Sequence, residues 1–279
     1  RANDILEQDI ASLCFDGPED ELLKTENTQP AILTVSIAAM MALGEHGVTP
    51  YMTAGLSLGE YSALVAAGAL RFEDAIPLVR KRGQFMQQAV PIGVGAMAAI
   101  IGLPSEKVEE CCRLVKDEGT VVPANYNCPG QIVVSGHKGA VEKVCVLAKD
   151  MGAKRGIMLP VSAPFHSPLL EPAGLQLKEE LEGVQLNKPE VPVISNVYAR
   201  PEDNTLIIGE NLVKQVSNPV RWQDSIEYMI DQGVHIFIEL GPGKALNGFL
   251  RKISRNIKGY NVGDMDSLEK TLRGLEEER

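Results

Sequence analysis

The spacing of hydrophobic and polar positions predicts alternating helices and short strands in the first third of the chain. Thr28 and Pro30 precede a long apolar run, as at a helix start, and the run predicts a helix to about Gly44. A short buried strand is predicted at residues 51–54 and an Ala- and Leu-rich helix at residues 61–69. A strand, a tight turn flanked by glycines and a helix, in this order, form half of a parallel α/β unit.

The next predicted helix, about residues 73–90, carries a charge on its apolar side. Leu78, Phe85 and Met86 belong to an apolar stripe with helical spacing, and Arg82 lies within that stripe. A buried guanidinium without an anionic partner costs several kcal/mol, so Arg82 is expected to face an anion inside the protein.

Between residues 93 and 160 the pattern predicts short strands and short helices in alternation. Strands are predicted at residues 96–101, 120–126, 131–135 and 154–159, with helices at residues 105–115 and 139–151. This βαββαβ order is typical of a ferredoxin-like domain. We therefore expect residues 93–160 to form a small domain inserted into a larger one.

Beyond residue 160 the chain returns to longer helices and buried strands. Helices are predicted at residues 169–181, 206–216, 221–232 and 267–277 and from 244 onwards, with strands at 191–196, 234–240 and 260–262. With the first part of the chain, these elements predict one α/β body with a parallel sheet, built from residues 1–92 and 161–279.

Composition narrows the class of protein. With 44% hydrophobic and 23% charged residues the chain is of ordinary globular type, and its net charge of −10 argues against binding to nucleic acid or an anionic membrane. No apolar run approaches the length of a membrane span, and no signal peptide is recognisable. Its 5 cysteines include no C-x-x-C pair and are expected to be reduced thiols. We expect a cytoplasmic protein.

Residues 55–59 match the nucleophile elbow G-x-S-x-G, with Ser57 at its centre. In such a turn the serine stands above the sheet, and the backbone N–H of Leu58 at the helix N-terminus is a natural oxyanion donor. A structural alternative stays open, because Ser57 and Glu60 also have the spacing of a capping box, in which the serine only caps its helix.

A nucleophilic serine needs a base, and the chain has 4 histidines. His46 and His137 are expected in exposed turns, and His235 is expected to have a structural role in a buried strand. His166 stands in an irregular segment, residues 162–168, where active-site bases are common. It is therefore the candidate base, with a structural role as the alternative. No acidic residue stands out as its partner, and a backbone carbonyl can orient the imidazole instead.

No other chemistry is indicated by the sequence. The histidines and cysteines lack metal-ligand spacing, and the glycine pairs near residues 93 and 241 lack the full phosphate-loop and dinucleotide patterns. A serine, a histidine and an inward-facing arginine thus remain. Together they point to acyl transfer with an acyl group that carries a carboxylate.

Several further segments of the sequence match a known family together with the elbow. These segments are residues 55–62 (GLSLGEYS), 80–87 (RKRGQFMQ), 95–100 (GAMAAI), 125–131 (NYNCPGQ), 163–167 (APFHS), 215–222 (QVSNPVRW) and 237–244 (FIELGPGK). They occur in family order from about Pro30 to the C-terminus. The sequence resembles the malonyl-CoA:acyl carrier protein transacylases of fatty-acid synthesis.

The resemblance implies a fold and a reaction. The fold would be an α/β-hydrolase-like body with the ferredoxin-like insert. Ser57 would take the malonyl group from malonyl-CoA, with His166 as base and then acid, Arg82 on the malonyl carboxylate and the Gln215 backbone carbonyl orienting His166. Coenzyme A would leave, and the phosphopantetheine thiol of acyl carrier protein would accept the acyl group in a ping-pong cycle. No cofactor or metal is implied, and a monomer is expected.

Two further residues, Phe165 and Leu56, are informative when the sequence is compared with this family. Phe165, before the histidine, resembles members selective for malonyl over methylmalonyl groups. Leu56 departs from the family, which usually has histidine at this position. We expect the difference to have only a modest effect on activity. The family also opens with a strand and a G-Q-G-x-Q motif that completes the oxyanion hole. The sequence as given does not contain them, so we expect that hole to be incomplete.

Other functions stay open from the sequence. A related serine hydrolase or thioesterase, an acyltransferase of a polyketide pathway and a non-catalytic binding module are the alternatives. Acyl carrier proteins are usually acidic, so a local basic patch is expected to receive one. The candidate residues for this patch, for which a merely solvated face is the alternative, are Arg251, Lys252, Arg255 and Lys258.

Overall fold

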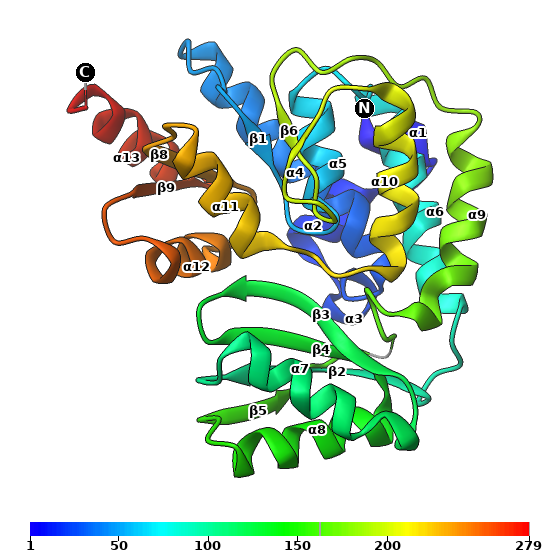
Figure 1. The fold of residues 1–279 in the computed structure, drawn as a ribbon. Coiled ribbons are helices and arrows are strands. Elements are labelled where there is room, and N and C mark those ends of the chain that lie inside the picture. Colours follow the sequence, from blue (N-terminus) through cyan, green and yellow to red (C-terminus); the bar gives the residue numbers. More distant parts are fainter. Residues whose placement is uncertain (162, 279) are drawn as a thin grey trace.

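The computed structural model describes residues 1–161 and 163–278, in which helices and short strands alternate (Figure 1). The α-helices are α1 (Ala2–Leu6), α2 (Ile10–Asp16), α3 (Glu19–Leu22), α4 (Thr25–Glu45), α5 (Gly59–Ala66), α6 (Phe72–Gln88), α7 (Ser105–Leu114), α8 (Lys138–Asp150), α9 (Glu171–Leu181), α10 (Thr205–Ser217), α11 (Trp222–Asp231), α12 (Ala245–Ile253) and α13 (Met265–Glu276). The strands are β1 (Thr53–Ala54), β2 (Gly95–Ile101), β3 (Val121–Cys128), β4 (Gln131–His137), β5 (Arg155–Met158), β6 (Val193–Ile194), β7 (Pro201–Glu202), β8 (Ile236–Leu240) and β9 (Lys258–Val262). Short 3-10 helices, η1 (Lys116–Glu118) and η2 (Pro168–Leu170), accompany them.

Helix α4 begins at Thr25, so the helix start predicted at Thr28 is wrong. The backbone N–H of Thr28 already donates to the carbonyl of Lys24, which places Thr28 inside the first turn. Its hydroxyl donates to the carbonyls of Leu22 and Lys24, at 2.5 and 3.1 Å. It therefore does not accept from a backbone N–H, as the side chain of an N-cap residue would. Pro30 consequently lies in the interior of the helix rather than, as predicted, in its first turn.

Strands β2 to β5 form one antiparallel sheet with the order β3-β4-β2-β5, and Figure 1 shows α7 and α8 packed beside it. The element order is the predicted βαββαβ. Hydrophobic side chains of these helices and strands form their own core, which includes Ile100, Val108 and Val144. Backbone hydrogen bonds between Val220 and the β3 residues Ala124 and Tyr126 connect this sheet to the segment before α11.

In place of the single parallel sheet predicted for the body, the described residues contain two small separate sheets. β1 pairs in parallel with β6, which pairs antiparallel with β7, while β8 and β9 form a separate parallel pair. β1 and β6 have only two residues each. Pro192 lies directly before β6 and Pro50 lies three residues before β1, and neither has an N–H to donate to a longer ladder.

The main core lies among α4, α5, α6, α9 and α10, and Leu33, Leu64, Ile76, Leu177 and Leu212 are fully buried in it. Helix α6 comes very close to α4 at Gly83. A Cβ atom on Gly83 would lie 2.7 Å from the Cα of Glu26 and from the carbonyl oxygen of Thr25. The absence of a side chain there lets the two helices approach closely and brings Arg82, the preceding residue, against α4.

We predict that Gly83→Ala lowers the free energy of unfolding by about 1–3 kcal/mol, as overpacking of a core typically does. The matched control is Gly248→Ala in α12, where a Cβ would meet nothing within 4 Å. That change should raise the free energy of unfolding by about 0.5–1 kcal/mol, because Ala favours the helix over Gly. Urea denaturation measures both, and equal effects at the two positions would contradict the close contact of α4 and α6.

Candidate active site

The turn from β1 to α5 carries Ser57 in a strained conformation. The φ angle of Ser57 is 53°, in the left-handed region that few residues other than glycine adopt. The turn is tight, since a Cβ on Gly55 would lie 1.9 Å from the backbone of Gly59. These are the features expected of the elbow predicted from G-x-S-x-G.

His166 contacts Ser57 directly. The Ser57 Oγ lies 2.7 Å from His166 Nε2, and His166 Nδ1 lies 2.7 Å from the backbone oxygen of Gln215. Because a carbonyl only accepts, Nδ1 carries the proton and Nε2 is the acceptor for the serine hydroxyl. The imidazole is therefore oriented to take a proton from Ser57, although no carboxylate of the described residues forms a hydrogen bond with it.

The capping-box alternative for Ser57 is wrong. Leu58 is the N-cap residue of α5, and no side chain caps that helix. The Ser57 hydroxyl is instead engaged by His166 and Arg82, and the Glu60 carboxyl accepts from Gln215 and from the backbone N–H of Asn196.

Arg82 is 1% exposed and lies against the serine. Its Nη2 donates to Ser57 Oγ at 3.0 Å and to Gln215 Oε1 at 2.8 Å, and its Nη1 donates to Gln29 Oε1 at 2.7 Å. Its guanidinium carbon also lies 5.3 Å from the centre of the Tyr61 ring. Every one of these partners is neutral. In residues 1–161 and 163–278, Arg82 forms no ion pair, and its Nε has no hydrogen-bond partner.

The pKa of Arg82 reflects this setting. Burial lowers the pKa of the guanidinium, while Tyr61 and Glu60 raise it in part. The ordinary pKa of arginine is so high that the group stays charged. The anion that the sequence predicts beside Arg82 is thus absent from the described side chains in contact with it, and a positive charge faces the serine without a direct counter-ion.

The remaining predicted residues surround this group. Leu58 is the N-cap residue of α5, so its N–H has no carbonyl within the helix as a partner. Phe165 is half-buried and packs against two of the hydrophobic cores. Leu56 packs against the core that contains Trp222. Ser162, which begins the predicted segment of His166, lies outside the described residues.

The other histidines lie elsewhere. His46 is exposed, as expected. His137 is half-buried, not exposed, and its Nδ1 accepts a hydrogen bond of 2.9 Å from the Thr120 N–H. His235 is exposed, so the structural role expected for it is wrong. It precedes β8, a strand that is only half-buried.

Comparison with known proteins shows to which family the chain belongs. A family model described as "Acyl transferase domain" matches residues 4–267. Malonyl CoA-acyl carrier protein transacylase of Bacillus subtilis is 50% identical over 278 residues, which are 99% of this chain and 88% of the relative. The chain belongs to the malonyl CoA-acyl carrier protein transacylase family. It is accordingly an acyltransferase.

Solved structures of this transacylase family are similar over nearly the whole chain. A crystal structure of the Clostridium perfringens transacylase is 48% identical with a TM-score of 0.95, and the match covers 99% of this chain and 87% of that one. A malonyl-transacylase in complex with a type II PKS acyl-carrier protein is 43% identical with a TM-score of 0.96, covering 98% and 89%. The mixed α/β fold is therefore that of the family.

Four polar residues or groups of this transacylase site were missed by sequence reasoning. Gln29, Glu60, Asn196 and the side chain of Gln215 are all buried around Ser57 and Arg82. Asn196 had a signal, because it ends a predicted strand, and sites of α/β proteins form at the carboxyl ends of strands. Gln29 had none, since its position predicts only a helix start.

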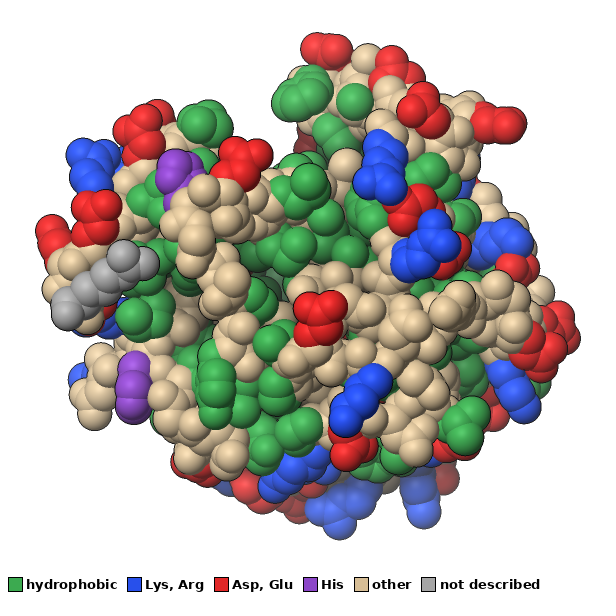
Figure 2. All heavy atoms as spheres, turned by 90° about the horizontal axis from the view of Figure 1, so that it is seen from above, with side chains coloured by type: hydrophobic (Ala, Val, Ile, Leu, Met, Phe, Trp, Pro, Cys, Tyr) green, Lys and Arg blue, Asp and Glu red, His purple; other side chains and the backbone are tan. Residues whose placement is uncertain are grey.

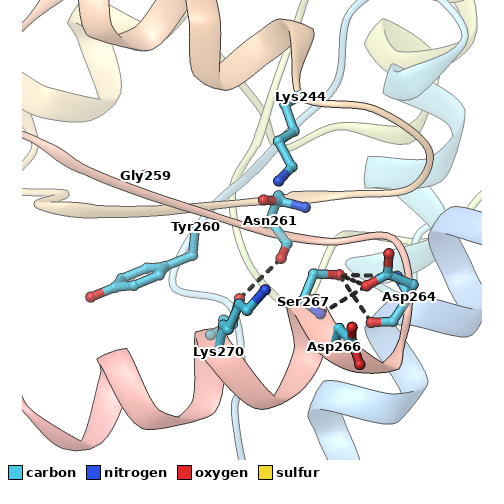
Figure 3. A pocket seen from close by; sticks show the side chains of 9 residues that line it. Lys244, Gly259, Tyr260, Asn261, Asp264, Asp266, Ser267 and Lys270 are labelled. Carbon is cyan, nitrogen blue, oxygen red and sulfur yellow. Dashed lines mark hydrogen bonds between the residues drawn. The ribbon is translucent and has the colours of Figure 1, made fainter.

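A separate polar hollow of the molecule lies on β9 and α13 (Figure 3). The hydrogen bonds between Asp264 and Ser267 drawn there are those of the capping box that begins α13. None of the predicted site residues lines this hollow. The described residues also hold no cluster of metal-ligating side chains and no helix long and apolar enough to cross a bilayer.

The predicted basic patch is exposed on and after α12. Lys252 donates to Gln131 Oε1 at 2.9 Å, and Lys258 forms an ion pair with Glu278. Arg251 and Arg255 form no ion pair within the described residues. On the face seen in Figure 2, acidic and basic side chains are interspersed with hydrophobic ones.

The setting of His166 gives a prediction for pH dependence. Burial, and then the charge of Arg82, lower the pKa of His166 from 6.5 to about 4. We predict that the rate of Ser57 labelling by a fluorophosphonate stays high on acidification and falls only as the pH passes about 4, where the imidazole becomes protonated. The unfolded chain takes up this proton at higher pH, so the free energy of unfolding also falls as the pH drops from 6.5 towards 4.

Labelling rates across pH, with circular dichroism at each pH to verify folding, measure this midpoint. A midpoint near 6.5 in a folded sample would contradict the buried, Arg82-facing imidazole.

Proposed function

We propose that this chain transfers the malonyl group from malonyl-CoA to the phosphopantetheine thiol of acyl carrier protein, through a malonyl ester on Ser57. The observation that carries the proposal is the buried Arg82 guanidinium, which has no carboxylate partner among the described residues and lies 3.0 Å from Ser57 Oγ. The carboxylate of a malonyl thioester is separated from the reacting carbonyl by a single methylene group. A charge at this distance from the nucleophile therefore suits that substrate.

The first half-reaction begins at the hydrogen bond between Ser57 and His166. As Ser57 Oγ attacks the thioester carbonyl carbon, its proton passes to His166 Nε2, and the Gln215 carbonyl stabilises the imidazolium through Nδ1–H. The N–H of Leu58 stabilises the oxyanion. When the tetrahedral intermediate collapses, the carbon–sulfur bond breaks, and the thiol of coenzyme A leaves with the proton from His166.

The second half-reaction reverses these steps with a different thiol. His166 takes the proton of the phosphopantetheine thiol, whose sulfur attacks the malonyl ester on Ser57. Collapse of the second intermediate breaks the ester bond and returns the proton to Ser57 Oγ. The bonds made and broken involve only a serine, a thiol and an acyl group, and the proposed chemistry uses no cofactor.

Arg82 holds the substrate carboxylate in this proposal. A guanidinium binds a carboxylate through two parallel hydrogen bonds, a geometry that lysine cannot reproduce. Its present bond to Ser57 Oγ would give way to the malonyl group, while Gln29 and Gln215 keep the guanidinium in place. Phe165, in the position before His166, would border the methylene of the malonyl group, and Leu56 would act only through packing.

The organisation of the chain that we propose follows from the same elements. Residues 1–92 and 161–279 would form an α/β-hydrolase-like body, and residues 93–160 a ferredoxin-like insert. The antiparallel order β3-β4-β2-β5 and the separate core of those strands support the insert. The exposed Arg251 and Arg255 are the part of the basic patch that we propose for contact with an acidic carrier protein, for which the carrier complex of the related transacylase gives a precedent.

The test is the intact mass of the protein after brief incubation with malonyl-CoA. We predict one malonyl adduct that is absent in Ser57→Ala and disappears when acyl carrier protein with its phosphopantetheine arm is added. Both half-reactions are then visible in one experiment.

Two other outcomes would overturn the proposal. A fluorophosphonate that labels Ser57 in a protein that malonyl-CoA leaves unmodified would favour another serine hydrolase. An adduct that water removes as fast as the carrier protein does would indicate a thioesterase.

A further inference from the structure

Two side chains from distant parts of the chain hold the backbone of the strained turn at Ser57. Asn196 Oδ1 accepts from the Ser57 N–H at 2.6 Å, and Asn196 Nδ2 donates to the carbonyl of Gly55 at 2.7 Å. Gln215 Nε2 donates to the carbonyl of Ser57 at 3.0 Å. The N–H and the C=O of the same residue are therefore both fixed by side-chain amides.

Both of these amide residues are themselves held by one carboxyl group. Glu60 Oε2 accepts from Gln215 Nε2 at 2.6 Å and from the backbone N–H of Asn196 at 3.1 Å. Glu60 is fully buried in α5, three positions after Ser57. Within the described residues its carboxyl forms no hydrogen bond with Ser57 Oγ or His166, so its hydrogen bonds act on them through Gln215 and Asn196.

Glu60 also decides which end of the Gln215 amide faces Arg82. The Gln215 Nε2 has two acceptors, Glu60 and the Ser57 carbonyl, and Oε1 accepts from Arg82 Nη2 at 2.8 Å. A rotated amide would place an N–H donor against the guanidinium and an oxygen against two acceptors. With the acceptor of Glu60 in place, only the observed orientation satisfies all these groups.

We propose that Glu60 is a positioning residue, which fixes the amide of Gln215 and the backbone of Asn196 and thereby the geometry of Ser57, His166 and Arg82. In its consequence for malonyl transfer this rests on the proposed function. The path to His166 is short, because the same Gln215 that Glu60 holds by its side chain accepts from His166 Nδ1 through its backbone oxygen. One residue thus connects the nucleophile, the base and the arginine.

The pKa of Glu60 is consistent with a positioning role. Burial, and then the carboxyl of Glu202, raise the pKa of Glu60 above its ordinary value, against the hydrogen bonds from Gln215 and Asn196 and the charge of Arg82. This shift favours the neutral carboxyl, which accepts from the two N–H groups without neutralising Arg82. Glutamine, which is also neutral and has the same shape, can replace it as an acceptor.

The test measures how fast a fluorophosphonate labels Ser57 in Glu60→Met and Glu60→Gln. Glu60→Met removes the acceptor, and labelling should slow by about 10- to 100-fold, whereas Glu60→Gln should stay within about threefold of the unmodified protein. The Nδ1–H proton resonance of His166, seen by NMR, should shift in Glu60→Met and not in Glu60→Gln. A residue that only fills space would leave this resonance unchanged.

Two further variants keep the test decisive. Glu239→Gln changes a half-buried carboxyl of β8 that accepts from the backbone N–H groups of Leu246 and Asn247 and not from Gln215, and it should leave labelling unchanged. If Glu60→Met does not fold, Gln215→Met interrupts the same path and should slow labelling to a similar degree. Unchanged labelling in the folded Glu60→Met or in Gln215→Met, or an equal loss in Glu60→Gln, would overturn the proposal. The probe carries no malonyl group, so failure of malonyl transfer in the unmodified protein would not affect this result.

Discussion

The site depends on a buried positive charge whose hydrogen-bond partners among the described residues are all neutral. Arg82 is almost completely buried, and its hydrogen bonds go to two amide oxygens and to the hydroxyl of Ser57. An ion pair inside the protein would make this charge easier to bury, but it would also consume it. Amide oxygens orient the guanidinium without cancelling the charge, which in the proposed function binds an anionic substrate beside Ser57.

This constraint explains several features far from one another in the sequence. Gly83 lets α6 approach α4 so that Arg82 reaches Gln29, and α10 brings Gln215 to the other side of the guanidinium. The same charge contributes to the low pKa of His166, which keeps the imidazole neutral and ready to accept a proton. Ser57 and His166 both have positive φ angles, 53° and 57°, so the two side chains proposed to react come from strained turns held by their surroundings.

Local signals in the sequence predicted many of the elements and singled out Ser57, His166 and Arg82, but they misplaced the start of α4. Helical spacing placed Arg82 on an inner face, and the G-x-S-x-G turn singled out Ser57. The backbone carbonyl of Gln215 came from the resemblance to a family and not from spacing. The contacts of Glu60 and Asn196 could not be predicted in this way, because a capping box suggested a local role for the first, and the second meets Ser57 only through the fold. The division of the parallel strands into separate sheets depends on which backbone groups pair, and hydrophobic spacing does not determine that.

The account is tested most directly by the affinity of Ser57→Ala, which cannot form the ester, for two coenzyme A thioesters. Calorimetric titration should show that malonyl-CoA binds about 10- to 100-fold more tightly than acetyl-CoA, as expected for hydrogen bonds between charged groups in a buried site. The difference should disappear in the double variant Ser57→Ala/Arg82→Met. Equal affinity of Ser57→Ala for the two thioesters would contradict the claim that Arg82 reserves its charge for the substrate carboxylate.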